Sequence, residues 1–153
     1  MFTPVEADLK KRTVVPVRNV RVFEKYQSGT TLKIEKNSLA YVGMHVGNGE
    51  HGTTISKIDK SKPDHDELTI TEITEVAEAG IEKGTVLFEA TAVDGTTKKN
   101  TANFVLYDAK KVEKGGPVLC TLLMQAYEVK ESKLELPVHD LDKAGLTSRF
   151  QFE

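Results

Sequence analysis

The alternation of apolar and polar residues along the chain predicts a protein built mainly from short strands. Residues 31–35 (TLKIE) alternate with a period of two, as a half-buried strand does, and residues 85–93 form a longer β-prone run. Asp94-Gly95 is the strongest hairpin signal, and the glycine-rich loop 43–52 also predicts a hairpin. The many short runs of Val, Thr and Ile therefore indicate strands joined by turns.

The last third of the chain has the clearest order of elements. Residues 104–107 predict a short apolar strand, and after a Gly-Gly-Pro break residues 118–129 predict one long, almost wholly apolar strand. Pro137 suits the first turn of a helix and Gly145 suits the position just after its last turn. A helix of about two turns is therefore predicted over 138–145.

The stretch 68–76 (LTITEITEV) fits two patterns. Leu68 and Ile70 alternate as in a strand, whereas Ile70, Ile73 and Val76 share one face of a helix. The threonines favour a strand first, followed by a helical turn over 75–79.

The leading segment differs from the rest in charge and pattern. Residues 1–12 show no periodicity, and 14–23 are extended in character but contain Pro16, which cannot donate to a sheet ladder. We therefore expect 14–23 to form either an edge strand or an unpaired extended arm. Residues 1–26 hold six basic and three acidic residues, a net of +3, which leaves −5 for the remainder of a chain of net charge −2. We therefore predict a flexible to extended N-terminal arm over 1–26 that reaches a partner, and a single β-rich domain over 27–153.

Composition excludes several classes of protein. With 153 residues, 39% apolar and 29% charged, the chain fits one soluble globular domain. The small net charge gives no whole-chain reason to expect nucleic acid or an anionic membrane. No apolar run approaches the roughly 20 residues needed to span a bilayer, and the N-terminus does not have the pattern of a secretory signal.

The chain offers little for metal or nucleophilic chemistry. His45, Glu50 and His51 form the most metal-like group, but their spacing supplies no third and fourth ligand, and a solvated loop is the better interpretation. The single cysteine, Cys120, lies inside the apolar run and is interpreted as a buried small hydrophobe. Neither a phosphate-binding loop nor a nucleophile elbow occurs. We predict no catalysis, no metal and no cofactor.

The order of elements from residue 84 onward resembles the capsid decoration and head-fibre proteins of tailed bacteriophages, typified by the lambda head decoration protein. The matching features are Gly-Thr-Val-Leu-Phe at 84–88, NFVLYD at 103–108, the apolar run 118–129, Leu-Pro-Val at 136–138 before the short helix, and the closing Arg-Phe-Gln-Phe at 149–152. The resemblance covers about the C-terminal half. The chain departs from the pattern in its extra glycine-rich region and in having alanine at position 126.

The resemblance implies a mainly β fold with short helices (α+β), a compact β-rich barrel or tulip-like domain with an extended N-terminal arm. It also implies a non-enzymatic virion structural protein, made in the host cytoplasm, that binds the capsid exterior as a homotrimer and stabilises the shell. Its arm would add a strand to the major capsid protein, with neither nucleic acid nor membrane as a partner. The capsid-binding residues expected on the arm are Lys10, Lys11, Arg12, Val14, Val15, Val17, Arg18, Val20 and Arg21.

The alternative is a β-rich adhesin-like module that binds a host surface or a glycan. The loops 43–52 and 60–67 would then make the contact. Glycan binding usually relies on exposed aromatic side chains, and no aromatic residue lies between Val42 and Leu68. The capsid interpretation is therefore preferred.

Overall fold

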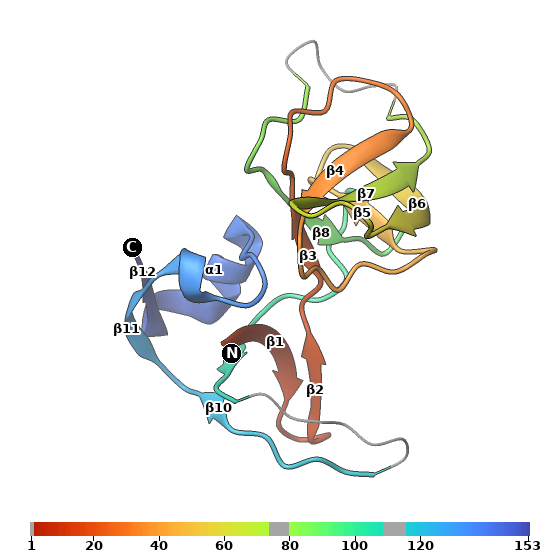
Figure 1. Cartoon of the computed structure of the whole chain (residues 1–153). Coiled ribbons are helices and arrows are strands. Elements are labelled where there is room, and N and C mark those ends of the chain that lie inside the picture. The colour runs from red at the N-terminus through yellow and green to blue at the C-terminus, as the bar shows by residue number, and fades with distance from the viewer. Residues whose placement is uncertain (1, 74–79, 109–115) are drawn as a thin grey trace. The chain divides into compact units, whose positions relative to one another are not determined.

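The structure is a computed structural model that describes residues 2–73, 80–108 and 116–153 (Figure 1). The chain divides into two compact units. Unit 1 comprises Met1–Val17 and Thr101–Glu153, and unit 2 comprises Arg18–Asn100. This division differs from the predicted arm over 1–26 and single domain over 27–153, because the leading segment contributes strands to both units.

Unit 2 is a curled antiparallel sheet of six strands in the order β3-β8-β5-β6-β7-β4 (Figure 1). Its strands are β3 (Asn19–Arg21), β4 (Thr31–Glu35), β5 (His45–Gly47), β6 (Gly52–Asp59), β7 (His65–Ile70) and β8 (Val86–Glu89). The two end strands meet where Val22 bridges Ile34 and the Phe23 amide donates to the Lys33 carbonyl over 2.9 Å. The predicted strand over 31–35 is confirmed.

Among the described residues of unit 2, thirteen buried apolar residues form one cluster. Leu32 and Ile34 of β4 are fully buried, as their alternation with polar neighbours predicts. In the ambiguous stretch, Leu68 and Ile70 are buried in strand β7. The helical turn predicted over 75–79 lies outside the described residues.

Three glycines allow two loops of unit 2 to touch backbone to backbone. A Cβ atom at Gly47 would lie 2.3 Å from the Gly95 Cα atom, and one at Gly52 would lie 2.4 Å from it. Gly95 itself adopts a φ of 69°, in the left-handed region that favours glycine. The glycine-rich loop therefore forms the predicted hairpin, β5 to β6, and its glycines serve close packing.

Unit 1 is built around a four-stranded antiparallel sheet in the order β10-β9-β1-β2. A parallel pair, β11 with β12, and three short helical segments complete it. Its elements are β1 (Thr3–Asp8), β2 (Thr13–Pro16), β9 (Phe104–Leu106), β10 (Leu122–Leu123), β11 (Ala126–Val129), η1 (Glu131–Lys133), α1 (Asp140–Leu146), η2 (Thr147–Arg149) and β12 (Phe150–Phe152). The described residues thus form a mainly β fold with short helices, and that prediction is confirmed.

Strand β1 corrects the prediction of an unpaired arm. It lies between β2 and β9 and pairs with both, and Val5 is buried beside Phe104. Residues 3–8, which show no periodicity in the sequence, thus form an inner strand of the protein's own sheet. Strand β2 lies at one end of this sheet, which suits Pro16 and its missing N–H donor.

Helix α1 is fixed at both ends by unit 1 itself. The buried Asp142 carboxylate accepts hydrogen bonds from the amides of Ala102 (2.8 Å) and His139 (3.2 Å), and His139 is the N-cap residue. Gly145 lies inside the helix and not after its end, where it was predicted. A Cβ atom there would lie 2.4 Å from the Ala102 carbonyl oxygen, so glycine serves the close approach of the helix to the 102 backbone.

The long apolar strand predicted over 118–129 is wrong in length and in burial. The structure places two short strands there, β10 and β11, and most of the run is exposed or only half-buried. The buried residues of unit 1 fall into two small clusters, of six and three members. Neither cluster is large enough to bury a run of twelve residues that is mostly apolar.

Candidate functional site

The hairpin β1–β2 ends in an exposed basic turn. The Asp8 carboxylate accepts hydrogen bonds from the amides of Lys10 and Lys11, both over 3.0 Å, and so fixes the turn. Arg12 completes it in the left-handed region, with a φ of 56°. The three side chains of Lys10, Lys11 and Arg12 are exposed. This basic turn directly precedes end strand β2, where Val14 and Val15 are half-buried.

The remaining predicted contact residues are engaged within the protein. Val17 is buried in the core of unit 1 and Val20 in the core of unit 2, each with 1% of its surface exposed. Arg18 lies 3.2 Å from Glu89, and Arg21 lies 3.6 Å from Glu35. The structure therefore does not bring the nine predicted residues together into one surface, because the chain crosses from one unit to the other at 17–18.

Glu89 is the centre of a buried polar cluster in unit 2. Its carboxylate accepts hydrogen bonds from Tyr41 (2.7 Å), Lys99 (2.9 Å) and Arg18 (3.2 Å), and its side chain is 4% exposed. Burial alone raises the pKa of Glu89, but the hydrogen bonds from Lys99, Tyr41 and Arg18 outweigh it, and the pKa is lowered. The carboxylate also raises the pKa of Lys99. The partners satisfy one another, so the cluster stabilises the fold and leaves no group poised for chemistry.

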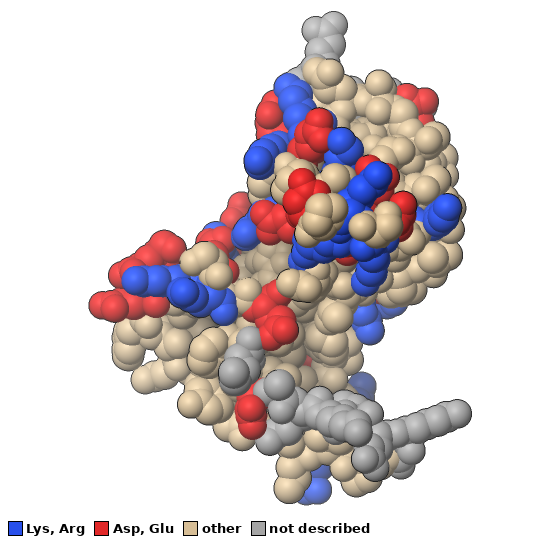
Figure 2. Space-filling view, in the orientation of Figure 1, with Lys and Arg blue, Asp and Glu red and all other residues tan. Residues whose placement is uncertain are grey.

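Charges elsewhere on unit 2 are also mixed in sign. Lys33 contacts Glu24 at 2.6 Å, and Lys36 contacts the buried Asp66 at 2.8 Å. On the face drawn in Figure 2, basic and acidic side chains of unit 2 lie intermixed. A surface with this mixture has no broad field of one sign to attract a highly charged partner.

The other candidate residues show no catalytic or metal-binding arrangement. His45 bonds Thr54 through Nδ1 at 2.7 Å, and His51 donates its amide to the Asn48 side chain. Among the described residues, no group of three or more His, Cys, Asp or Glu is placed to hold a metal ion. Cys120 is half-buried and not fully buried as predicted. No described helix is both long and apolar enough to cross a membrane.

Large exposed apolar side chains concentrate in unit 1. Leu119 is 93% exposed, Tyr127 67% and Met124 59%. All three come from the run 118–129 that was expected to be buried. The sequence carried one signal against that expectation, since a strand of twelve residues is about twice the usual length.

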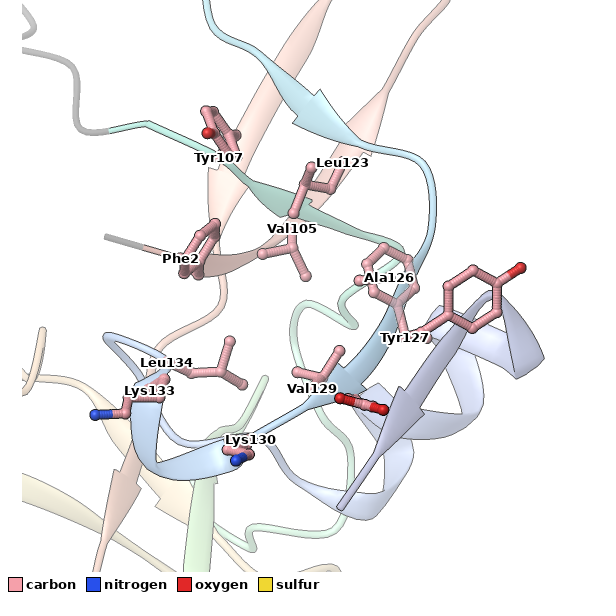
Figure 3. A pocket seen from close by; sticks show the side chains of 12 residues that line it. Phe2, Val105, Tyr107, Leu123, Ala126, Tyr127, Val129, Lys130, Lys133 and Leu134 are labelled. Atoms are coloured by element: carbon pink, nitrogen blue, oxygen red, sulfur yellow. The ribbon is translucent and has the colours of Figure 1, made fainter.

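An apolar pocket opens beside this run, within unit 1. It has a volume of about 380 Å³. Phe2, Val105, Val129 and Leu134 converge on it, and Leu123 stands at its upper edge in Figure 3. Tyr107, Ala126, Tyr127, Glu128, Lys130, Lys133 and Phe150 complete the lining. Its floor is apolar, and its charged groups are Glu128 of β11, Lys133 of η1 and Lys130 between these two elements. Sequence reasoning did not find this pocket, because its lining comes from segments far apart in the chain.

The comparison with known proteins bears on the whole chain, because the family described as "Head fiber protein", from phages, matches residues 1–151. The chain belongs to this family. It is thus a structural protein of the phage head and a component of the virion, as the resemblance to decoration and head-fibre proteins implied. No curated protein and no solved structure matches the chain.

Proposed function

We propose that this head fibre protein binds the outer surface of the capsid through unit 1 and stabilises the shell. The basic turn 10–12, end strand β2 and the exposed residues Val118 and Leu119 form the proposed contact. The observation that carries the proposal is the contrast in exposure. Unit 1 presents its most exposed apolar side chain, Leu119, and the exposed basic turn to solvent, where among the described residues only Lys11 has an ion-pair partner, Asp8 at 3.7 Å. In unit 2, by contrast, Arg18 and Lys36 are paired with the buried carboxylates of Glu89 and Asp66.

In this proposal the capsid-binding element is the folded end strand β2, and not the flexible arm that the sequence predicted. Strand β2 pairs with β1 on one side only, so its other side offers main-chain groups to a strand of the major capsid protein. The adjacent Lys10, Lys11 and Arg12 complement an acidic rim and direct the approach. Because the edge is already folded, little conformational entropy is lost on binding.

Three copies acting together belong to the same proposal. The resemblance to trimeric decoration proteins supports this number, and a trimer multiplies contacts that are weak in one copy. The protein then cements neighbouring capsid subunits from outside by contact area and hydrogen bonds. No reaction and no cofactor enter this function.

Co-sedimentation with assembled heads tests the proposal. The triple variant Lys10→Glu/Lys11→Glu/Arg12→Glu is expected to bind heads at least tenfold more weakly, since each reversal replaces an attraction with a repulsion of similar size. The matched control is Lys57→Glu/Lys60→Glu/Lys62→Glu, three exposed lysines of unit 2, which is expected to bind as the parent protein does. Equal loss in both variants, or in neither, would overturn the assignment of the contact to unit 1.

A further inference from the structure

We infer that the apolar pocket of unit 1 binds an extended acidic peptide segment that inserts a bulky apolar side chain. This inference goes beyond capsid binding through the basic turn and does not depend on it. Three features of the pocket carry it: its floor, its rim and its open strand edges.

The floor of the pocket fits a large apolar side chain. Phe2, Val105, Val129 and Leu134 line it from four different segments, and its volume of about 380 Å³ lies within the range of ligand-binding clefts. Phe2 is held in place by its bridge to Leu134 and by an edge-to-face contact with Tyr107, whose ring centroid lies 5.6 Å away. The pocket is therefore formed before any partner arrives.

The rim of the pocket favours an acidic partner. Lys130 and Lys133 stand on one side, next to Val129 and Leu134 (Figure 3). Within the described part of the chain neither lysine has an ion-pair partner, because the nearby Glu131 contacts Lys143 at 2.5 Å. Glu128 is the one acidic lining residue, so the rim carries a net charge of +1.

Open strand edges beside the pocket favour a peptide over a small apolar molecule. Strand β10 is the end strand of its sheet, and β11 pairs only with β12. The pairing of β11 is irregular between Ala126 and Val129, where Glu128 adopts a φ of 56°. A non-glycine residue in this region is strained, and such strain is often found at binding sites. Among the described residues no further strand pairs with β10 or β11 on these edges, so their main-chain groups can pair with an extended peptide, as in other strand-addition complexes.

Fluorescence anisotropy with the full chain tests this inference. The probe is a fluorescein-labelled peptide, Asp-Glu-Val-Phe-Glu-Asp, and the comparison peptide has Gly-Gly in place of Val-Phe. The first peptide is expected to bind saturably and at least tenfold more tightly than the second. Equal binding of the two peptides, or no binding of either, would overturn the inference.

Charge variants separate the pocket from general attraction. Lys130→Glu/Lys133→Glu is expected to weaken binding of the Val-Phe peptide about tenfold, and Glu128→Gln to strengthen it about twofold, by the usual size of exposed charge interactions. The matched control, Lys57→Glu/Lys60→Glu at two exposed lysines of unit 2, is expected to leave it unchanged. Equal weakening by the two lysine pairs would show nonspecific attraction and contradict the inference.

A blocked pocket and the oligomeric state complete the test. Ala126→Phe places a ring at the pocket and is expected to abolish peptide binding, while circular dichroism checks its fold. Leu123→Ala, which removes bulk from the edge instead, covers the case in which Ala126→Phe misfolds and is expected to weaken binding several-fold. Sedimentation velocity with and without the peptide measures self-association of the chain. If the peptide binds only when an oligomer of the chain dissociates, the pocket is occupied by a second copy of the chain and the inference is wrong.

Discussion

Unit 2 and unit 1 solve the problem of burying apolar surface in different ways. Unit 2 curls a six-stranded sheet around one cluster of thirteen buried residues. Unit 1 divides its buried residues between two smaller clusters and leaves residues such as Leu119, Met124 and Tyr127 in solvent. Exposed apolar patches on a soluble protein mark surfaces that meet another molecule. This difference supports our proposal that the capsid contact is made by unit 1, although unit 2 also exposes Val42 and Val93.

The largest effect is expected where the backbones of unit 2 touch. Gly47→Ala places a Cβ atom 2.3 Å from the Gly95 Cα atom and is expected to lower the free energy of unfolding by about 3 kcal/mol. Chemical denaturation, monitored by hydrogen exchange of the amides of unit 2, measures this loss of stability. Gly43→Ala is the control, because its φ is 90° but its surroundings are open, and it is expected to cost about 1 kcal/mol. Equal losses in the two variants would show that the contact is not tight.

In unit 1 the largest effect is expected at the cap of helix α1. Asp142→Ala leaves the amides of Ala102 and His139 without their acceptor and is expected to cost about 2 to 3 kcal/mol. Its neighbour Asp140 has a side chain that is 94% exposed, so Asp140→Ala is expected to change stability by less than about 0.5 kcal/mol. Hydrogen exchange resolved by unit shows whether the loss is confined to unit 1. A loss spread equally over both units would contradict the division into separate cores.

Much of this architecture could be predicted from the sequence, and the exceptions have physical causes. Local patterns predicted the strand 31–35, the glycine-rich hairpin and the short helix, because alternation, turn residues and Pro137 act over a few positions. The pairing of β1 with β9 was missed because the partners lie about a hundred residues apart. Gly145 lies inside helix α1 because the helix packs closely against the Ala102 backbone, and no local pattern encodes this contact.

The candidate site was predicted only in part. The excess of basic charge led to the prediction that Lys10, Lys11 and Arg12 contact a partner, and the structure leaves all three exposed. Val17 and Val20 have the same β-prone character as Val14 and Val15, and only the fold shows that they are core residues. Sequence alone did not show that the run 118–129 is exposed. An apolar segment is expected to be buried, but its sequence does not show whether the core of its own domain or another molecule covers it.

The stability of unit 2 is expected to depend on pH in the acid range, because its buried polar cluster contains the ionised Glu89. Because the folded pKa of Glu89 is lowered from 4.5, its contribution is complete above about pH 4.5 and is lost as the pH falls through the folded pKa. Glu89→Gln is expected to cost about 2 kcal/mol at pH 7 and to remove this acid-dependent loss. Urea denaturation between pH 2 and pH 7 measures both. A variant with the pH profile of the parent protein would show that Glu89 does not carry the effect.

The smallest effect on stability is expected at the exposed apolar run. Leu119 is almost fully exposed, so Leu119→Ser is expected to change the free energy of unfolding by less than about 0.5 kcal/mol. The same variant is expected to bind heads several-fold more weakly. Val93→Ser, at an exposed apolar residue of unit 2, is the control and is expected to change neither quantity. Loss of stability in Leu119→Ser would mean that the run packs within its own unit.

Hydrogen–deuterium exchange of the protein, free and bound to assembled heads, tests the central claim most directly. The account predicts that new protection appears at residues 9–16 and 117–121 of unit 1, while β4 to β7 of unit 2 exchange as they do in the free protein. Protection confined to unit 2, with residues 9–16 and 117–121 unchanged on the head, would contradict it.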